Sequence, residues 1–298
     1  MIDAILWVLQ GMWSGVAGVF YVLANLGTVL DFSDKENIMR VIFYGASSEF
    51  FFVFFNTVLI VFVIGIFSHR FLWAVVVGLE GFSNIVGRTA AWAGLIMVLQ
   101  QILVVFLQAI FRVSDISVGP FGLDVTMPVG WYADGLKLHN AIIVTLCCAY
   151  TFTQRGHVRV DLIYAAVSHR TKRAIDMFGS LFFMMPAMLL TWFYAWFFLW
   201  RHLITPKVNS TDTLERTLLK AKAMRWNVET IGFSPNGFNA YFLFKVLLVL
   251  FCFMMLVQAV AFFYRSYLEF TEGPESADKY FDKDRLGDED AELVAQIH

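Results

Sequence analysis

Long apolar runs separated by short polar segments dominate the chain, and most of these runs are long enough to cross a membrane. A helix needs about 20 mostly apolar residues to span the hydrocarbon core of a bilayer. Six runs meet or approach this length, and the fourth needs residues from Trp131 onward to cross: 5–30, 44–66, 89–111, 138–152, 178–200 and 238–263. The pattern predicts an all-α polytopic membrane protein with six spans.

Between the second and third runs the pattern changes to apolar and polar residues at helical spacing. Trp73, Val76 and Val77 are interleaved there with Glu80, Asn84 and Arg88. This mixture is typical of an amphipathic helix that lies in the membrane interface. The chain is therefore divided into an N-terminal extension of two transmembrane helices (1–66), an interfacial amphipathic helix (67–88), a four-span core (89–263) with extracytoplasmic loops at 113–137 and 201–237, and an acidic cytoplasmic tail (264–298).

The connector after the fourth run alternates between charged and apolar residues. His157, Arg159 and Asp161 alternate with valines and a leucine, so the ionisable groups lie on one side of an extended backbone. Such a segment suits a membrane surface, with one side in water and one in lipid. It is predicted to be a structural loop at a lipid or subunit interface, formed by Arg155, Gly156, His157, Arg159 and Asp161.

Composition agrees with a membrane protein: 59% of residues are hydrophobic, 15% are charged and the mean hydropathy is +0.66, whereas soluble domains carry about a quarter charged residues. The net charge of −2 is unevenly placed, because residues 269–298 contribute −7 and the remainder +5. The sequence contains no basic patch that would indicate binding to nucleic acid. The apolar N-terminal run lacks a basic start and is interpreted as a retained span.

Charge also predicts the orientation, since Lys and Arg are enriched in cytoplasmic loops. The short loop 154–174 holds five Lys/Arg and is placed in the cytoplasm, together with both termini. The segment 201–238, placed outside, carries six Lys/Arg and opposes this assignment.

The polar residues inside the runs are the candidates for function. Glu49 and Lys245 are ionisable residues near span ends, for which snorkelling or a helix–helix pair is the favoured interpretation. Glutamines within spans face other helices as a rule, in this chain or in a partner subunit. The possible helix–helix or subunit contacts are Glu49, Gln100, Gln101, Gln108, Lys245 and Gln258. The three cysteines lie in apolar runs and the six histidines form no metal or haem spacing, so no catalytic, cofactor or metal residue is predicted.

From the connector onward the sequence resembles the small membrane (Q) subunit of tripartite ATP-independent periplasmic (TRAP) transporters. The resemblance rests on the segments RGHVRVDLIY (155–164), RAIDMFGSLFF (173–183) with Pro186, Trp196 and Trp200, residues 229–237, LVQ (256–258), and FSNIVGRTAAW (82–92) followed by MVL (97–99). It covers about residues 71–263. The two N-terminal spans, the insertion 205–225 and the acidic tail depart from the family pattern.

The resemblance implies a scaffold without catalytic residues, in the bacterial inner membrane. Such a subunit assembles with a large M subunit, which holds the substrate and sodium sites, while a periplasmic binding protein delivers the substrate. An ion-gradient-driven secondary transporter of organic anions such as carboxylates is implied. Arg159→Ala or Asp161→Ala is then expected to lower the yield of the complex. The alternatives are the membrane anchor of a haem- or quinone-linked redox enzyme, and a stand-alone channel or carrier.

Overall fold

The computed structural model of the chain describes residues 2–29, 31–118, 125–154, 167–230, 237–277 and 279–282, and it is 78% helical. The α-helices are α1 (Ile2–Ala24), α2 (Leu26–Val29), α3 (Lys35–Tyr44), α4 (Ser48–Phe67), α5 (His69–Val105), α6 (Val129–Thr153), α8 (His169–Gly179), α9 (Met185–Arg201), α10 (Leu214–Ala221) and α11 (Phe242–Glu272). Two π-helical turns, η1 (Phe106–Ile110) and η3 (Ser180–Met184), and a 3₁₀ turn, η4 (Pro274–Ser276), extend these helices. Two short antiparallel pairs join β1 (Asp115–Val118) to β2 (Val125–Pro128), and β3 (Ile204–Thr205) to β4 (Arg225–Trp226).

Among the described residues, five helices are long and apolar enough to cross a membrane, which agrees with an all-α membrane protein. They are Ser48–Phe67, His69–Ile110, Val129–Thr153, His169–Arg201 and Phe242–Glu272. Five of the six predicted runs overlap these helices over most of their length. The remaining run, 5–30, corresponds to α1, in which Leu6–Val22 forms a shorter apolar stretch. That α1 spans the membrane stays a prediction.

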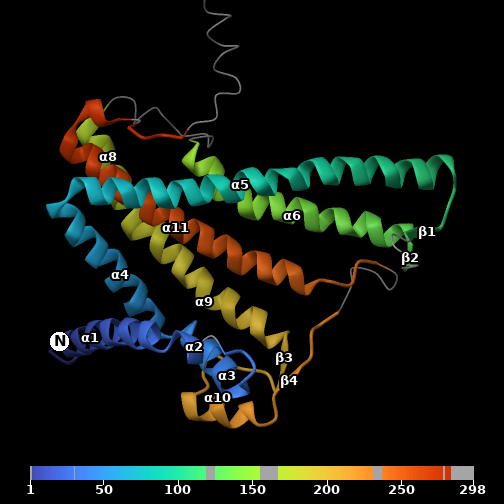
Figure 1. Cartoon of the computed structure of the whole chain (residues 1–298), viewed down its shortest axis with the longest axis horizontal. Coiled ribbons are helices and arrows are strands. Elements are labelled where there is room, and N and C mark those ends of the chain that lie inside the picture. Colours follow the sequence, from blue (N-terminus) through green and yellow to red (C-terminus); the bar gives the residue numbers. More distant parts are fainter. Residues whose placement is uncertain are drawn as a thin grey trace, which may run out of the picture.

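Figure 1 shows the arrangement of the helices. Helices α5 and α6 run side by side along one edge, α11 and α9 descend from them obliquely, and α4 leads away to α1. Helix α1 crosses α4 where Gly11 and Gly15 meet Phe52 and Asn56, because glycines four residues apart let two helices approach closely. The side-chain amide of Asn56 donates to the carbonyl of Met12 over 2.8 Å at this crossing.

The boundary predicted at residue 88 between an interfacial helix and a span does not coincide with a break in the helix. One helix continues through it, and α5 with η1 covers 42 residues, which corresponds to about 63 Å at about 1.5 Å per residue. The composition does change at residue 88, but no proline in this segment interrupts the helix. Asn84 and Arg88 find polar partners near the C-terminus instead of ending the helix, as described below. Whether the first part of α5 lies in the interface stays a prediction.

Helix α11 continues past residue 263 to Glu272, into the segment that was predicted as the acidic tail. Tyr264 and Leu268 are almost completely buried and pack with Leu72 and Val76 of α5 in one apolar cluster. The hydroxyl of Tyr264 donates to the carbonyl of Val58 in α4 over 2.7 Å. These contacts make the segment after residue 263 part of the helical core.

The opposite end of the molecule carries a small knob, formed by α3, α10 and the β3–β4 pair (Figure 1). Its core joins Ile38, Met39 and Ile42 of α3 to Ile204 and residues around α10. The indole N–H groups of Trp192 and Trp196 in α9 donate to the carbonyls of Gly45 and Ile42 over 2.8 and 2.9 Å. Helix α3 of the N-terminal extension and the insertion 205–225 therefore pack together in the knob.

A buried carboxylate holds the knob's loop in place. Asp212 is 6% exposed, contacts Lys220 and Arg216, and accepts a hydrogen bond from the backbone N–H of Asn209. Burial acts to raise the pKa of Asp212, but the hydrogen bonds and the positive charges outweigh it and hold the pKa below its usual value. The carboxylate therefore stays ionised and links α10 to the loop before it.

Candidate functional site: a buried charge network and the exposed face of α5

The loop that the sequence analysis singled out lies outside the described residues. Arg155, Gly156, His157, Arg159 and Asp161 follow directly after α6 and its C-terminal residue Gln154, where the described part of the chain stops until residue 167. Their roles at a lipid or subunit interface stay predictions.

Two of the predicted contact glutamines join helices of this chain. The amide of Gln100 in α5 donates to the carbonyl of Tyr132 in α6 over 2.6 Å. Gln258 in α11 is 1% exposed, and its amide oxygen accepts a hydrogen bond of 2.9 Å from the hydroxyl of Thr153 in α6. Both glutamines therefore fix α6 against its neighbours and are directed to the interior of the chain.

The other two glutamines lie on the open side of α5. Gln101 and Gln108 are exposed, and Val105 between them is 46% exposed. Gln101 lies in α5, and Gln108 follows seven residues later in the π-helical turn η1 that extends this helix. The most apolar 18-residue window of this helix is only 6% buried inside the chain. This side of α5 consequently presents two amides within an otherwise apolar surface.

The two ionisable candidates in the spans differ in their surroundings. Glu49 is exposed at the start of α4, where Ser48 donates a long hydrogen bond to it. Lys245 is 4% exposed and its Nζ lies 2.6 Å from Oε2 of Glu229, with the ring of Phe198 5.1 Å away. The partner of Lys245 therefore comes from the segment after the knob and not from another span.

Glu229 also lies 3.3 Å from Nε2 of His202 at the end of α9. The hydrogen bond from Lys245 holds the pKa of Glu229 below its usual value, against the opposing effect of partial burial. Because the pKa is lowered in the folded state, this carboxylate stabilises the fold above its unfolded pKa, and the contribution is lost as the pH falls through the folded pKa.

We expect a measurable pH dependence from this group. Lowering the pH from about 6 to about 3 should reduce the thermal midpoint of the detergent-solubilised protein less in Glu229→Gln than in the wild type. Glu215→Gln, which changes an exposed glutamate of α10, is the control and should follow the wild type. An unchanged acid sensitivity in Glu229→Gln would show that other carboxylates set it.

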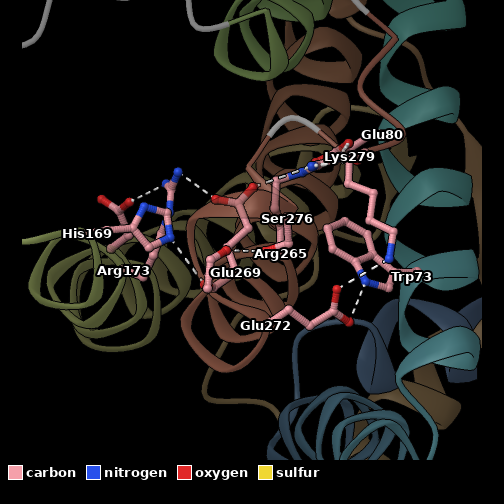
Figure 2. A network of polar contacts seen from close by, with 11 residues as sticks. Trp73, Glu80, His169, Arg173, Arg265, Glu269, Glu272, Ser276 and Lys279 are labelled. Atoms are coloured by element: carbon pink, nitrogen blue, oxygen red, sulfur yellow. Dashed lines mark hydrogen bonds and ion pairs between the residues drawn. The ribbon is translucent and has the colours of Figure 1, made fainter.

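The main polar site lies where α5, α8 and α11 meet, and no part of it was among the predicted site residues (Figure 2). Arg265 of α11 donates from Nε to Oε1 of Glu80 over 2.6 Å and from NH2 to Oε2 over 2.5 Å. Arg265 is 4% exposed and Glu80 is 5% exposed. This two-point geometry is the strongest form of arginine–carboxylate pairing, and it fixes α11 against α5.

The network continues from α11 to α8 through a completely buried carboxylate. Glu269 lies one turn after Arg265; its Oε2 is 2.5 Å from NH2 of Arg173, and its Oε1 is 3.5 Å from NH1 of Arg265. Arg173 also contacts Asp176 over 3.1 Å. Nε2 of His169 lies 3.2 Å from the backbone carbonyl of Glu269. Two arginines thus stand between three carboxylates on three helices, so the charges nearly balance inside the site.

The C-terminal segment closes the site from the other side (Figure 2). Glu272 accepts a hydrogen bond of 2.9 Å from the indole of Trp73 and lies 3.3 Å from Nζ of Lys279. NH1 of Arg265 donates to the carbonyl of Lys279 over 3.2 Å. The chain after α11 therefore folds back along α5.

The same segment reaches the end of α6. Asp282 lies 3.0 Å from NH1 of Arg88 and accepts a hydrogen bond from the amide of Asn84, while its carbonyl accepts one of 2.8 Å from Gln154. The hydrogen bond from Arg88 holds the pKa of Asp282 below its usual value. Asn84 and Arg88, which suggested an interfacial helix by sequence, are thus the anchor for the C-terminal segment.

This arrangement joins α5, α8 and α11 through ion pairs. The carboxylates are occupied by arginines, and the described residues contain no group of three or more His, Cys, Asp or Glu side chains placed to hold a metal ion. The sequence signal that was overlooked is the i, i+4 pair of Arg265 and Glu269 with Leu268 beside it. That spacing continues the helical pattern of the last span.

Comparison of the chain with protein-family models, with curated proteins and with solved structures finds no match.

Proposed function

We propose that this chain is the small auxiliary subunit of an ion-gradient-driven secondary transporter for organic anions such as carboxylates. In this proposal it is a Q-type subunit of a TRAP transporter in a bacterial inner membrane. It assembles with a large M-type subunit that binds the substrate and the coupling ion, which the family resemblance predicts to be sodium. A periplasmic binding protein delivers the substrate.

The observation that carries the proposal is the open side of α5. Gln101 and Gln108 are exposed within an apolar span, of which only 6% of an 18-residue apolar stretch is buried inside the chain. Amides in a span are normally satisfied by hydrogen bonds to other helices, because lipid offers no partner. A second membrane protein packed against this side supplies such partners, as an M-type subunit would.

The buried charge network supports a static role for the chain. Arg265 and Glu80 are joined at two points and are almost completely buried. Separating α11 from α5 would leave both charges without a partner, which is strongly unfavourable in a buried site. A bundle joined in this way suits a scaffold against which another subunit moves.

The site of contact can be tested by replacing the two amides. In co-expression with the M-type subunit from a neighbouring reading frame, the double variant Gln101→Leu/Gln108→Leu should copurify with the partner at clearly lower yield. The matched control is Gln10→Leu, which removes an exposed glutamine from α1 and should leave the yield unchanged. If the partner copurifies equally well with the double variant and with Gln10→Leu, the contact between the two subunits does not involve Gln101 and Gln108.

The transport function has its own test in liposomes. Uptake of a carboxylate with a sodium gradient and the binding protein should require both membrane subunits, and this chain alone should give none. Uptake by this chain alone would contradict the auxiliary role and favour a stand-alone carrier. A Soret band in the purified protein would instead favour the anchor of a haem-linked redox enzyme.

A further inference from the structure

A small polar pocket lies between α1 and α4 and is not used by the proposed function. It is lined by Trp7, Gln10, Gly11 and Ser14 of α1 and by Ser48, Glu49 and Phe52 of α4. Its volume is about 230 Å³. Sites for drug-sized ligands are larger, with about 300–1,000 Å³. The pocket therefore suits a small polar group.

The close crossing of the two helices forms this pocket. Gly11 lies against the ring of Phe52, where an added Cβ atom would be 2.2 Å from Cε2. The ring of Trp7 stands edge-on to that of Phe52, with the ring centroids 5.3 Å apart. Because α1 approaches α4 so closely at Gly11, the side chains of Gln10 and Ser14 line the same pocket as the first turn of α4.

The pocket presents hydrogen-bond acceptors. The hydroxyl of Ser14 donates to the carbonyl of Gly11 over 3.0 Å, and the hydroxyl of Ser48 donates to Oε2 of Glu49 over 3.5 Å. Each hydroxyl uses its hydrogen within the chain, so its oxygen keeps lone pairs for a ligand. The carboxylate of Glu49 and the amide oxygen of Gln10 are further acceptors. A group that donates several hydrogen bonds matches this lining.

Glu49 gives the pocket a negative charge. The side chain is exposed, and no lysine or arginine is among the described residues that line the pocket. Its hydrogen bond from Ser48 is long and comes from a neutral group. The rings of Trp7 and Phe52 add to this preference, since aromatic rings attract cations to their faces. The lining therefore favours a cation that carries N–H groups.

The position of the pocket on α4 places it within reach of lipid head groups. Ser48 and Glu49 are the first two residues of α4, which has 20 residues and is long and apolar enough to cross a membrane. A helix of about 20 residues just spans the hydrocarbon core of a bilayer. When a helix of this length crosses, its first turn lies at the membrane interface.

We infer that this pocket binds a primary ammonium group, either in the head group of phosphatidylethanolamine or in a free alkylamine. Glu49 supplies the counter-charge, and the oxygens of Ser14 and Ser48 accept hydrogen bonds from the N–H groups. A quaternary ammonium has no N–H group and so matches the lining less well. The inference concerns α1 and α4 and is independent of the transport function proposed from α5.

The test is native mass spectrometry of the delipidated full-length chain with phosphatidylethanolamine, phosphatidylcholine or free ethanolamine added. The wild type should retain one phosphatidylethanolamine in clear preference to phosphatidylcholine, or should bind free ethanolamine. Displacement of the lipid by ethanolamine would identify the amine alone as the ligand, and retention of the lipid would identify the head group. Equal retention of the two lipids without an ethanolamine adduct would overturn the inference.

A first variant removes the charge with little change in shape. Glu49→Gln should reduce the preference for phosphatidylethanolamine about fivefold, which is the size expected for a partly exposed ion pair. Glu36→Gln is the matched control, because it changes another exposed glutamate in the first turn of a helix, and it should keep the preference. An unchanged preference in Glu49→Gln would overturn the inference.

A second variant fills the pocket and leaves Glu49 in place. Ser14→Leu should lose the preferential binding, whereas Ala17→Leu, at an exposed position of α1 outside the lining, should retain it. Binding by Ser14→Leu equal to that of Ala17→Leu would also overturn the inference. Circular dichroism of each variant shows whether its helices are intact.

Discussion

Replacing Arg265 by methionine lowers the free energy of unfolding by about 3–5 kcal/mol, the range expected when one partner of a buried ion pair is removed. The variant leaves Glu80 without its two-point partner and removes one of the two arginines that lie beside Glu269. Titration of the detergent-solubilised protein with SDS, followed by circular dichroism, measures the change.

Two further variants separate the charge effect from lost packing. The double variant Arg265→Met/Glu80→Met should recover most of the lost stability, because apolar pairs of similar volume often replace buried ion pairs without loss. Arg70→Met removes an exposed arginine at the start of α5 and should change the stability by at most about 0.5 kcal/mol. If Arg265→Met proves as stable as Arg70→Met, the network does not hold the helices together.

The second large effect is expected at the contact of α5 with α6. A Cβ atom added at Gly87 would lie 2.1 Å from Cβ of Tyr150, which no rotamer change relieves. Gly87→Ala should therefore destabilise the protein by about 1–3 kcal/mol, as overpacking of a core does. The same SDS titration measures it.

Gly94 on the same helix provides the matched control. A Cβ atom there would lie 3.6 Å from Cδ1 of Ile143, which is an ordinary contact. Alanine is preferred to glycine in a helix by about 1 kcal/mol, so Gly94→Ala should be neutral or stabilising. Equal effects of the two substitutions would mean that α5 and α6 do not pack as closely as described.

The spans were predictable because hydrophobic length is a strong local signal. The runs around residues 44–66 and 178–200 correspond to helices long and apolar enough to cross a membrane. The helix ends were less predictable. Arg265 and Glu269 lower the hydropathy after residue 263, and only the position of Glu80, far away in sequence, explains why the helix continues there.

The charge network was not predictable for the same reason. Its pairs join residues such as Glu80 and Arg265, or Arg173 and Glu269, which are distant in sequence and have no pattern in common. The knob was also hidden, because α3 and α10 each show only an amphipathic pattern. Their contact depends on how α9 presents Trp192 and Trp196 to the turn at Gly45.

The most direct test of the auxiliary-subunit proposal is affinity purification of the tagged chain from native membranes in mild detergent, with mass spectrometry of its partners. We expect a stoichiometric, very hydrophobic protein of about twelve spans, as the family resemblance implies. Recovery of the chain alone from membranes that contain such a partner would contradict the proposal.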